Sequence, residues 1–168
     1  MMLDVAIEAD PEWDSSSGWT CLAEQAVQAA VAESAFPQLA QSERSVEVSI
    51  RLTGDEDVRA LNAEWRGKDM PTNVLSFPMA ELDQLNQLRG AGPELMLGDI
   101  ILARGVCARE AEEKAIPIEM HAAHLMVHGT LHLLGHDHQD DGSAADMEAR
   151  ETRALARLGI ADPYLAAC

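Results

Sequence analysis

Three histidines toward the C-terminal end of the chain have a spacing suited to binding a single metal ion. His128 and His132 are four residues apart, so on a helix their imidazoles project from the same face, one turn apart. Gly135 can end that helix in a left-handed conformation and turn the chain back. Such a turn would bring His138 to the same ion. Three neutral nitrogens suit one Zn²⁺ per chain, with a fourth position open for water.

The residue after the first histidine separates this pattern from that of zinc peptidases. In the elongated peptidase motif, a glutamate at this position is the general base that activates water on the zinc ion. This chain has Gly129 there, which cannot take a proton. A peptidase would therefore need a base from elsewhere in the fold. A closed structural zinc site is also disfavoured, because such sites usually include cysteine and the three cysteines lie far away in sequence.

Three further histidines lie close to this pattern. His121 and His124 share, or nearly share, the helical face of His128, so each is a candidate ligand, a residue that orients a ligand, or a buried core histidine. We favour the last two roles, because the turn after the helix supplies a third ligand more naturally. His136 competes with His138 for the third position, and the spacing alone leaves both open.

The histidine string resembles the signature of the bacterial YbeY family, the endoribonucleases of ribosomal RNA maturation. Other stretches resemble further blocks of that family, in the same order: residues 61–69, 71–78, 98–100 and 158–164. Asn73 stands where an aspartate is common in the family. The resemblance favours His138 over His136 as the third ligand, because the family position that matches His136 is variable.

The resemblance implies a zinc-dependent, single-strand-specific endoribonuclease that acts in 16S rRNA 3′ end maturation and in ribosome quality control. The implied partners are single-stranded RNA, rRNA, the small ribosomal subunit and an assembly GTPase, with neither DNA nor a membrane among them. Two alternatives remain open. One is a zinc hydrolase of another class, either a peptidase or an amide hydrolase. The other is a non-catalytic ribosome assembly factor that uses zinc for stability.

Cleavage of a phosphodiester also needs a cation near the phosphate, because negative charge develops there in the transition state. Arg66 is the best candidate. It stands at the end of a predicted helix that Gly67 terminates, and Lys68 comes two residues later. The matching arginine of the resembling family is treated as functional. The alternative is an ordinary surface arginine at the C-terminal end of a helix, where cations are common.

Composition sets the limits of these interpretations. The chain has 168 residues, 47% of them hydrophobic, and a net charge of −17. This indicates one globular domain, and the acidity argues against tight, non-specific binding of nucleic acid. A nuclease with this charge would bind through a focused site or a partner. The absence of a signal-like start, of a membrane-length apolar run and of a cysteine framework predicts a cytoplasmic protein.

Apolar periodicity predicts an α+β fold in a single domain over residues 1–168, with a small mixed sheet of about four strands packed against about five helices. The predicted strands cover residues 3–7, 46–52, 74–79 and 99–103, and the predicted helices cover residues 19–36, 54–66, 104–115, 118–134 and 144–158. The helix over residues 118–134 is apolar nearly all round. It is therefore expected to be the central, buried helix that carries the metal ligands.

Two finer expectations concern the second helix and the segment that follows the third strand. Thr53 and Glu56 have the spacing of a capping box at the start of the second helix. Trp65 continues the apolar stripe of that helix and is expected in the core. Residues 81–97 are expected to form a long, mobile loop, because glycines and a proline interrupt them.

Overall fold

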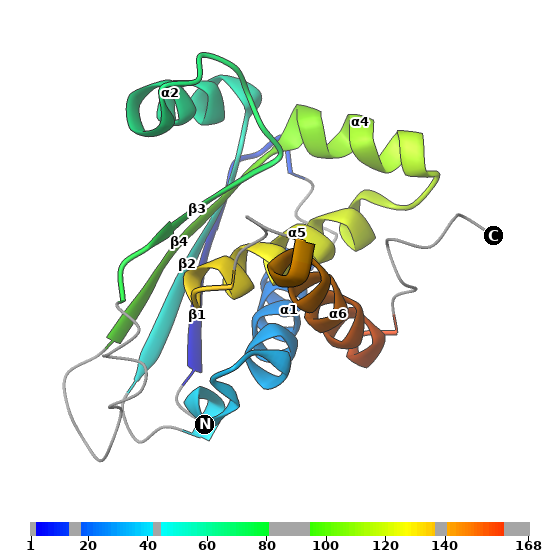
Figure 1. Ribbon diagram of the computed structural model, residues 1–168. Coiled ribbons are helices and arrows are strands. Elements are labelled where there is room, and N and C mark those ends of the chain that lie inside the picture. The colour runs from blue at the N-terminus through cyan, green and yellow to red at the C-terminus, as the bar shows by residue number, and fades with distance from the viewer. Residues whose placement is uncertain (1–2, 14–17, 42–44, 81–94, 137–140, 160–168) are drawn as a thin grey trace.

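The fold is built on a four-stranded mixed sheet (Figure 1). This computed structural model describes residues 3–13, 18–41, 45–80, 95–136 and 141–159. The strands are β1 (Leu3–Ala9), β2 (Val46–Thr53), β3 (Val74–Pro78) and β4 (Leu95–Ala103). Their order across the sheet is β1-β2-β4-β3, in which β3 alone runs antiparallel to its neighbour. The predicted α+β class with a small mixed sheet is confirmed.

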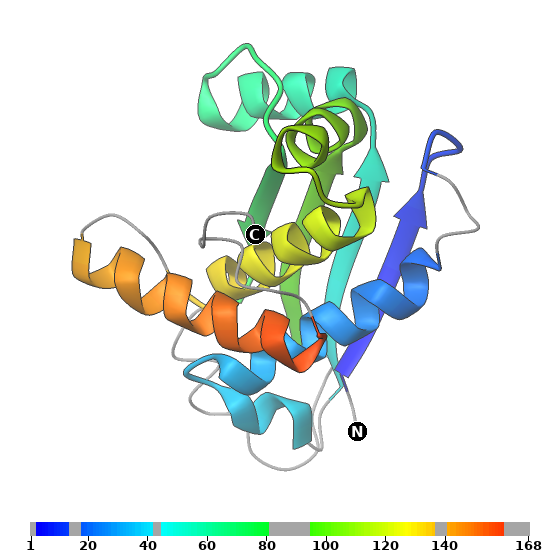
Figure 2. The same ribbon diagram turned by 90° about the vertical axis from the view of Figure 1, so that its right-hand side faces the viewer.

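The described part of the chain contains the expected five α-helices and one short 3-10 helix. They are α1 (Trp19–Glu33), η2 (Pro37–Gln41), α2 (Asp55–Arg66), α4 (Arg104–Lys114), α5 (Ile118–Leu133) and α6 (Asp141–Arg157). Helices α1 and α5 lie against one face of the sheet, and α6 packs on both of them from outside (Figure 2). No helix in these described segments has the length and apolar content needed to span a bilayer.

The two faces of β4 are covered by different helices. Ile100 and Leu102 belong to the main core, which includes the buried apolar residues of α1 and α5. Ile101 and Ala103, which alternate with them along the strand, pack in a smaller cluster with Val58 of α2. Helices α2 and α5 therefore lie on opposite faces of β4, as Figure 1 also shows.

Helix α5 lies in the core, as the sequence predicts, while its carrying of metal ligands stays a prediction. Most of its residues are buried, and Pro117 precedes its first turn. Gly135 has a φ of 90°, and its N–H donates to the carbonyl of His132 at 3.0 Å. The chain therefore leaves the helix just after the second histidine, at the glycine expected to end it.

The predicted capping box of the second helix is wrong. Gly54 occupies the N-cap of α2, which has no side-chain cap hydrogen bond. Thr53 is the last residue of β2, and its hydroxyl lies 2.8 Å from a carboxylate oxygen of Asp10 and 2.6 Å from one of Asp57. Two carboxylates near the hydroxyl thus replace the reciprocal pairing expected with Glu56.

The predicted core position of Trp65 is also wrong. Its side chain is 66% exposed, because α2 reaches the sheet through Val58 and Leu61 in its earlier turns. Strand β4 begins at Leu95, so the last residues of the predicted loop belong to the sheet. Residues 81–94, with the mobility expected of them, lie outside the described residues.

Candidate metal centre

The two helical histidines lie next to each other on α5, with their rings edge to face. Nε2 of His128 is 3.0 Å from Nε2 of His132, and the two ring centroids are 4.6 Å apart. Two nitrogens bound to one tetrahedral zinc ion at about 2.1 Å would lie about 3.4 Å apart, close to this separation. Both residues are half-buried. This donor pair fits a zinc ion.

A buried carboxylate from the last helix stands behind this pair. Glu151 of α6 is fully buried, and its Oε1 accepts a hydrogen bond from Nδ1 of His128. Its Oε2 is 3.4 Å from Nε2 of His124. An ionised carboxylate can only accept, so the proton of a neutral His128 is held at Nδ1, which leaves the lone pair of Nε2 directed toward His132. Metal-binding histidines usually have such a partner.

Sequence reasoning missed Glu151, although the last helix contained a signal. Met147, Glu151, Leu155 and Leu158 follow one another at spacings of four, four and three, so the glutamate falls on the apolar stripe of its helix. A lone carboxylate on such a stripe must find a partner when the helix packs. The stripe faces α1 and α5, and two histidines of α5 are those partners.

His121 belongs to a separate polar cluster at the start of α5. Its Nε2 lies 2.8 Å from Oε1 of Glu110 on α4, and the same oxygen accepts a hydrogen bond from the side-chain amide of Asn73 at 3.0 Å. Burial lowers the pKa of His121, against the opposing effect of the Glu110 hydrogen bond. An ionised aspartate in place of Asn73 could not donate this bond. The cluster therefore depends on an amide at this position.

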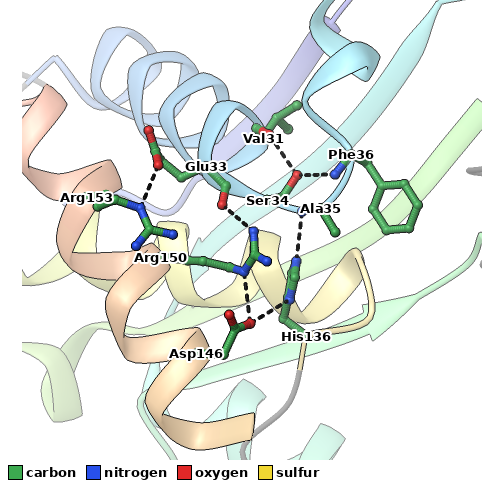
Figure 3. A network of polar contacts seen from close by, with 9 residues as sticks. All are labelled: Val31, Glu33, Ser34, Ala35, Phe36, His136, Asp146, Arg150 and Arg153. Carbon is green, nitrogen blue, oxygen red and sulfur yellow. Dashed lines mark hydrogen bonds and ion pairs between the residues drawn. The ribbon is translucent and has the colours of Figure 1, made fainter. Parts of the chain in front are cut away.

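His136 takes part in a network that joins three segments of the chain (Figure 3). Its Nε2 accepts a hydrogen bond from the N–H of Ala35 at 3.2 Å, while its Nδ1 lies 3.8 Å from a carboxylate oxygen of Asp146. Asp146 is also bound by Arg150, which donates to the carbonyl oxygen of Glu33 at 2.8 Å. Burial, and then the nearby Arg150, lower the pKa of His136. Through the hydrogen bond at Nε2 and the proximity of Nδ1 to Asp146, His136 thus links the segment after α1, the helix α6 and the end of α5.

His138, the third expected ligand, lies outside the described residues. The structure therefore brings together two of the three predicted ligands, and it places the competing His136 in the network of Figure 3.

Gly129 lies on the side of α5 that packs closely against β4. A Cβ built on this glycine would lie 2.9 Å from Cγ2 of Ile100 and 3.2 Å from its Cδ1. The residue after His128 is therefore directed at β4, on the packed side of the helix. A glutamate side chain at this position would therefore clash with Ile100 unless α5 or β4 shifted.

Arg66 is not brought next to the histidine pair. It is exposed in the last turn of α2, which covers the opposite face of β4 from α5. Within the described part of the chain, neither Arg66 nor Lys68 makes a side-chain hydrogen bond or an ion pair. Gly67 ends the helix with a φ of 69°, as expected from the sequence.

Comparison with known proteins shows both the fold and the family of this chain. The solution structure of TM1509 from Thermotoga maritima is similar with a TM-score of 0.55, over 96% of this chain and 99% of that one. At 21% sequence identity this likeness shows the fold. The sequence model of the family described as endoribonuclease YbeY matches residues 12–159, and the chain belongs to this family.

Relatives named endoribonuclease YbeY match nearly the whole chain. The protein of Rhizorhabdus wittichii is 52% identical over 164 residues, which cover 97% of each chain. That of Sphingopyxis alaskensis is 52% identical and covers 97% of this chain and 98% of its own. That of Agrobacterium fabrum is 44% identical over 96% of this chain and 95% of its own.

Proposed function

We propose that this protein is a metal-dependent endoribonuclease that cleaves single-stranded RNA, with rRNA as its substrate. The proposal rests on membership of the endoribonuclease YbeY family and on one structural observation, the two Nε2 atoms of His128 and His132 that face each other at 3.0 Å. It includes maturation of the 16S rRNA 3′ end and ribosome quality control in the cytoplasm. The small ribosomal subunit and an assembly GTPase are its proposed partners. Residues 1–168 are proposed to form a single YbeY-like metallohydrolase domain.

His128, His132 and His138 are the proposed ligands of one zinc ion. A zinc ion in such a site acts as a Lewis acid, which activates water and polarises a phosphoryl oxygen. Glu151 keeps the proton of His128 on Nδ1 and thereby holds the imidazole in the orientation that binding needs. Because Gly129 leaves no side chain beside the first ligand, the proposed site contains no base at the position that peptidases use.

Arg66 is proposed to act at the phosphate of the RNA and not at the metal. A guanidinium is permanently charged and cannot serve as a base, so its contribution is electrostatic stabilisation of the phosphorane. Its exposure and its lack of an ion pair within the described part of the chain leave it available to an incoming phosphate.

The test is cleavage of a single-stranded RNA by the purified protein, paired with analysis of its metal content. We expect about one zinc ion per chain, loss of cleavage with a chelator, and recovery when zinc is restored. His128→Ala should lose both metal and cleavage. Cleavage that persists in metal-free protein would contradict the proposal. Hydrolysis of a peptide panel without cleavage of RNA would favour the other class of zinc hydrolase, and metal binding with neither activity would favour an assembly factor.

A further inference from the structure

One tryptophan of this chain lies on the surface while the other two lie in the core. Trp13 and Trp19 are 1% and 5% exposed and pack edge to face, whereas Trp65 is 66% exposed in the last turn of α2. Tryptophan has the largest apolar surface of any side chain, and folded proteins usually cover most of it. In Figure 1, α2 stands at the periphery of the molecule. The exposed indole is therefore available to contact a ligand.

The turn that follows Trp65 is held in place by interactions with α2. The buried side chain of Asn62 donates from Nδ2 to the carbonyl oxygen of Met70 at 2.9 Å. Arg59 binds Asp69 through Nε at 2.8 Å and through Nη2 at 3.3 Å. The surface beside Trp65 is therefore fixed before any ligand arrives, which lowers the entropic cost of binding.

Two cations that make no ion pair in the described structure follow Trp65 in the chain, and the exposed Glu64 precedes it. Six arginines of the described chain are paired with carboxylates: Arg51, Arg59, Arg109, Arg150, Arg153 and Arg157. Within the same described segments, Arg66 and Lys68 make no ion pair, and both are exposed directly beside Trp65. Lys114, a third such cation, stands at the far end of α4. Asp69, the acidic residue of this turn, is already bound by Arg59.

We infer that Trp65 is a stacking platform for one base of a single-stranded RNA, with Arg66 and Lys68 on the neighbouring phosphates. The inference rests on the proposed function and extends it to the residue that binds a base. An exposed indole flanked by free cations has the composition of surfaces that bind single strands. A base in a duplex is already stacked on its neighbours, so this platform selects unpaired RNA. Arg66 is also the residue proposed to act at the cleaved phosphate, so the base stacked on Trp65 is expected to lie near that phosphate.

The test uses the full-length protein made metal-free with a chelator, so that binding is measured without cleavage. A short unstructured oligoribonucleotide should quench the emission of Trp65, while the buried Trp13 and Trp19 stay unquenched. Trp65→Leu should abolish the quenching and weaken binding about ten-fold or more, as expected from the loss of one stacked base. Trp65→Tyr should restore most of the binding, because it keeps an aromatic face. Met79→Ala, which removes another exposed apolar side chain just after β3, is the matched control and should bind as the parent does.

Kinetics of the metal-loaded protein separate this inference from the proposed activity. Trp65→Leu should raise KM for a single-stranded RNA and leave kcat nearly unchanged. Stacking with quenching but no cleavage would support the platform and contradict the proposed activity. Cleavage by Trp65→Leu with the parent KM would overturn the platform and leave the activity standing. The platform would also be overturned if the protein bound duplex RNA as tightly as single-stranded RNA. The same holds if Trp65→Leu lost binding to a protein partner while its RNA affinity stayed unchanged.

Discussion

The carboxylate of Glu151 contacts Nδ1 of His128 across the interface between α6 and α5. It is fully buried, and the imidazole that it fixes faces His132 on its other side. Carboxylates that bind a metal-ligating histidine in this way set its tautomer and its orientation. This relationship makes Glu151 the residue on which the geometry of the proposed metal site depends.

We predict that Glu151→Gln lowers the affinity for zinc about 10–100-fold, the usual effect of losing such a partner. The amide keeps the size of the side chain but removes the charge that favours the proton on Nδ1. Affinity would be measured by competition with a chelator, and the thermal stability of the metal-free variant would report on folding. Glu148→Gln, on the exposed side of the same helix, is the control. A folded Glu151→Gln variant with the parent affinity would show that the carboxylate does not act on the metal.

A second prediction distinguishes the two candidates for the third ligand. His138→Ala should lose bound zinc, while His136→Gln should keep it. Glutamine retains an acceptor for the N–H of Ala35, so the network of Figure 3 is only partly disturbed. Elemental analysis of the two purified variants measures their zinc content and so identifies the third ligand. Loss of zinc from His136→Gln, with retention in His138→Ala, would reverse the assignment.

Arg66→Ala should reduce RNA cleavage about 10²–10³-fold, in line with the removal of one charge-stabilising group from an active site. Zinc content and melting temperature should stay near the parent values, because Arg66 is exposed and no ion pair holds it in the described structure. Arg66→Lys should have an intermediate rate, since it keeps the charge and loses the forked geometry. Arg109→Ala, an exposed arginine of α4, is the control. Cleavage at the parent rate in Arg66→Ala would contradict the proposed role of Arg66, and Lys68 and Arg104 would then be the next residues to test.

Gly129→Ala should destabilise the protein by about 1–3 kcal/mol, the usual cost of overpacking a core. The added Cβ meets Ile100, so α5 must shift away from β4. Ile100→Ala removes the atoms that clash, and the double variant should therefore lose less stability than the two single changes add up to. Chemical denaturation of the four proteins measures this coupling. If the stability losses of the two single variants were strictly additive, contact with Ile100 would not be the reason for the glycine.

The ion pairs of Glu33 should make stability depend on pH in the acidic range. Hydrogen bonds from Arg157 and Arg153 lower the pKa of Glu33 from its ordinary value of 4.5, against the opposing effect of burial. A carboxyl with a lowered folded pKa stabilises the protein above its ordinary pKa, and this contribution is lost as pH falls through the folded value. Glu33→Gln should therefore lower the melting temperature at pH 7, and the difference from the parent should shrink below the ordinary pKa. A difference that stays constant down to strongly acidic pH would contradict the assignment.

Local signals explain which parts of this fold and site the sequence could predict. The four-residue spacing of the two histidines and the glycine that ends their helix both act within a few residues, and both appear in the structure as expected. The α+β class follows from periodicities that likewise depend on short segments. Nothing in the described residues tests the third histidine, so its role stays a prediction.

Tertiary packing explains what could not be predicted. Trp65 continues an apolar stripe, but α2 covers only part of a small sheet and its last turn extends beyond the core. Thr53 has the spacing of a cap, yet carboxylates of Asp10 and Asp57 lie nearer to its hydroxyl. Glu151 becomes a partner of the histidines only because α6 docks on α5, and local periodicity does not specify which helices pair.

Helix α6 is the last of the described helices, so it is made after α5 during synthesis. The earlier elements leave the ribosome first, so the histidines of α5 emerge before the carboxylate that orients His128. The ion pairs of Glu33 on α1 likewise form only after Arg153 and Arg157 have been made, 120 and 124 residues later. In a nascent chain, the histidine pair therefore lacks the orienting carboxylate of Glu151 until α6 has folded onto α5. An enzyme proposed to cut ribosomal RNA would thus acquire its oriented ligand only after α6 has been made and has docked on α5.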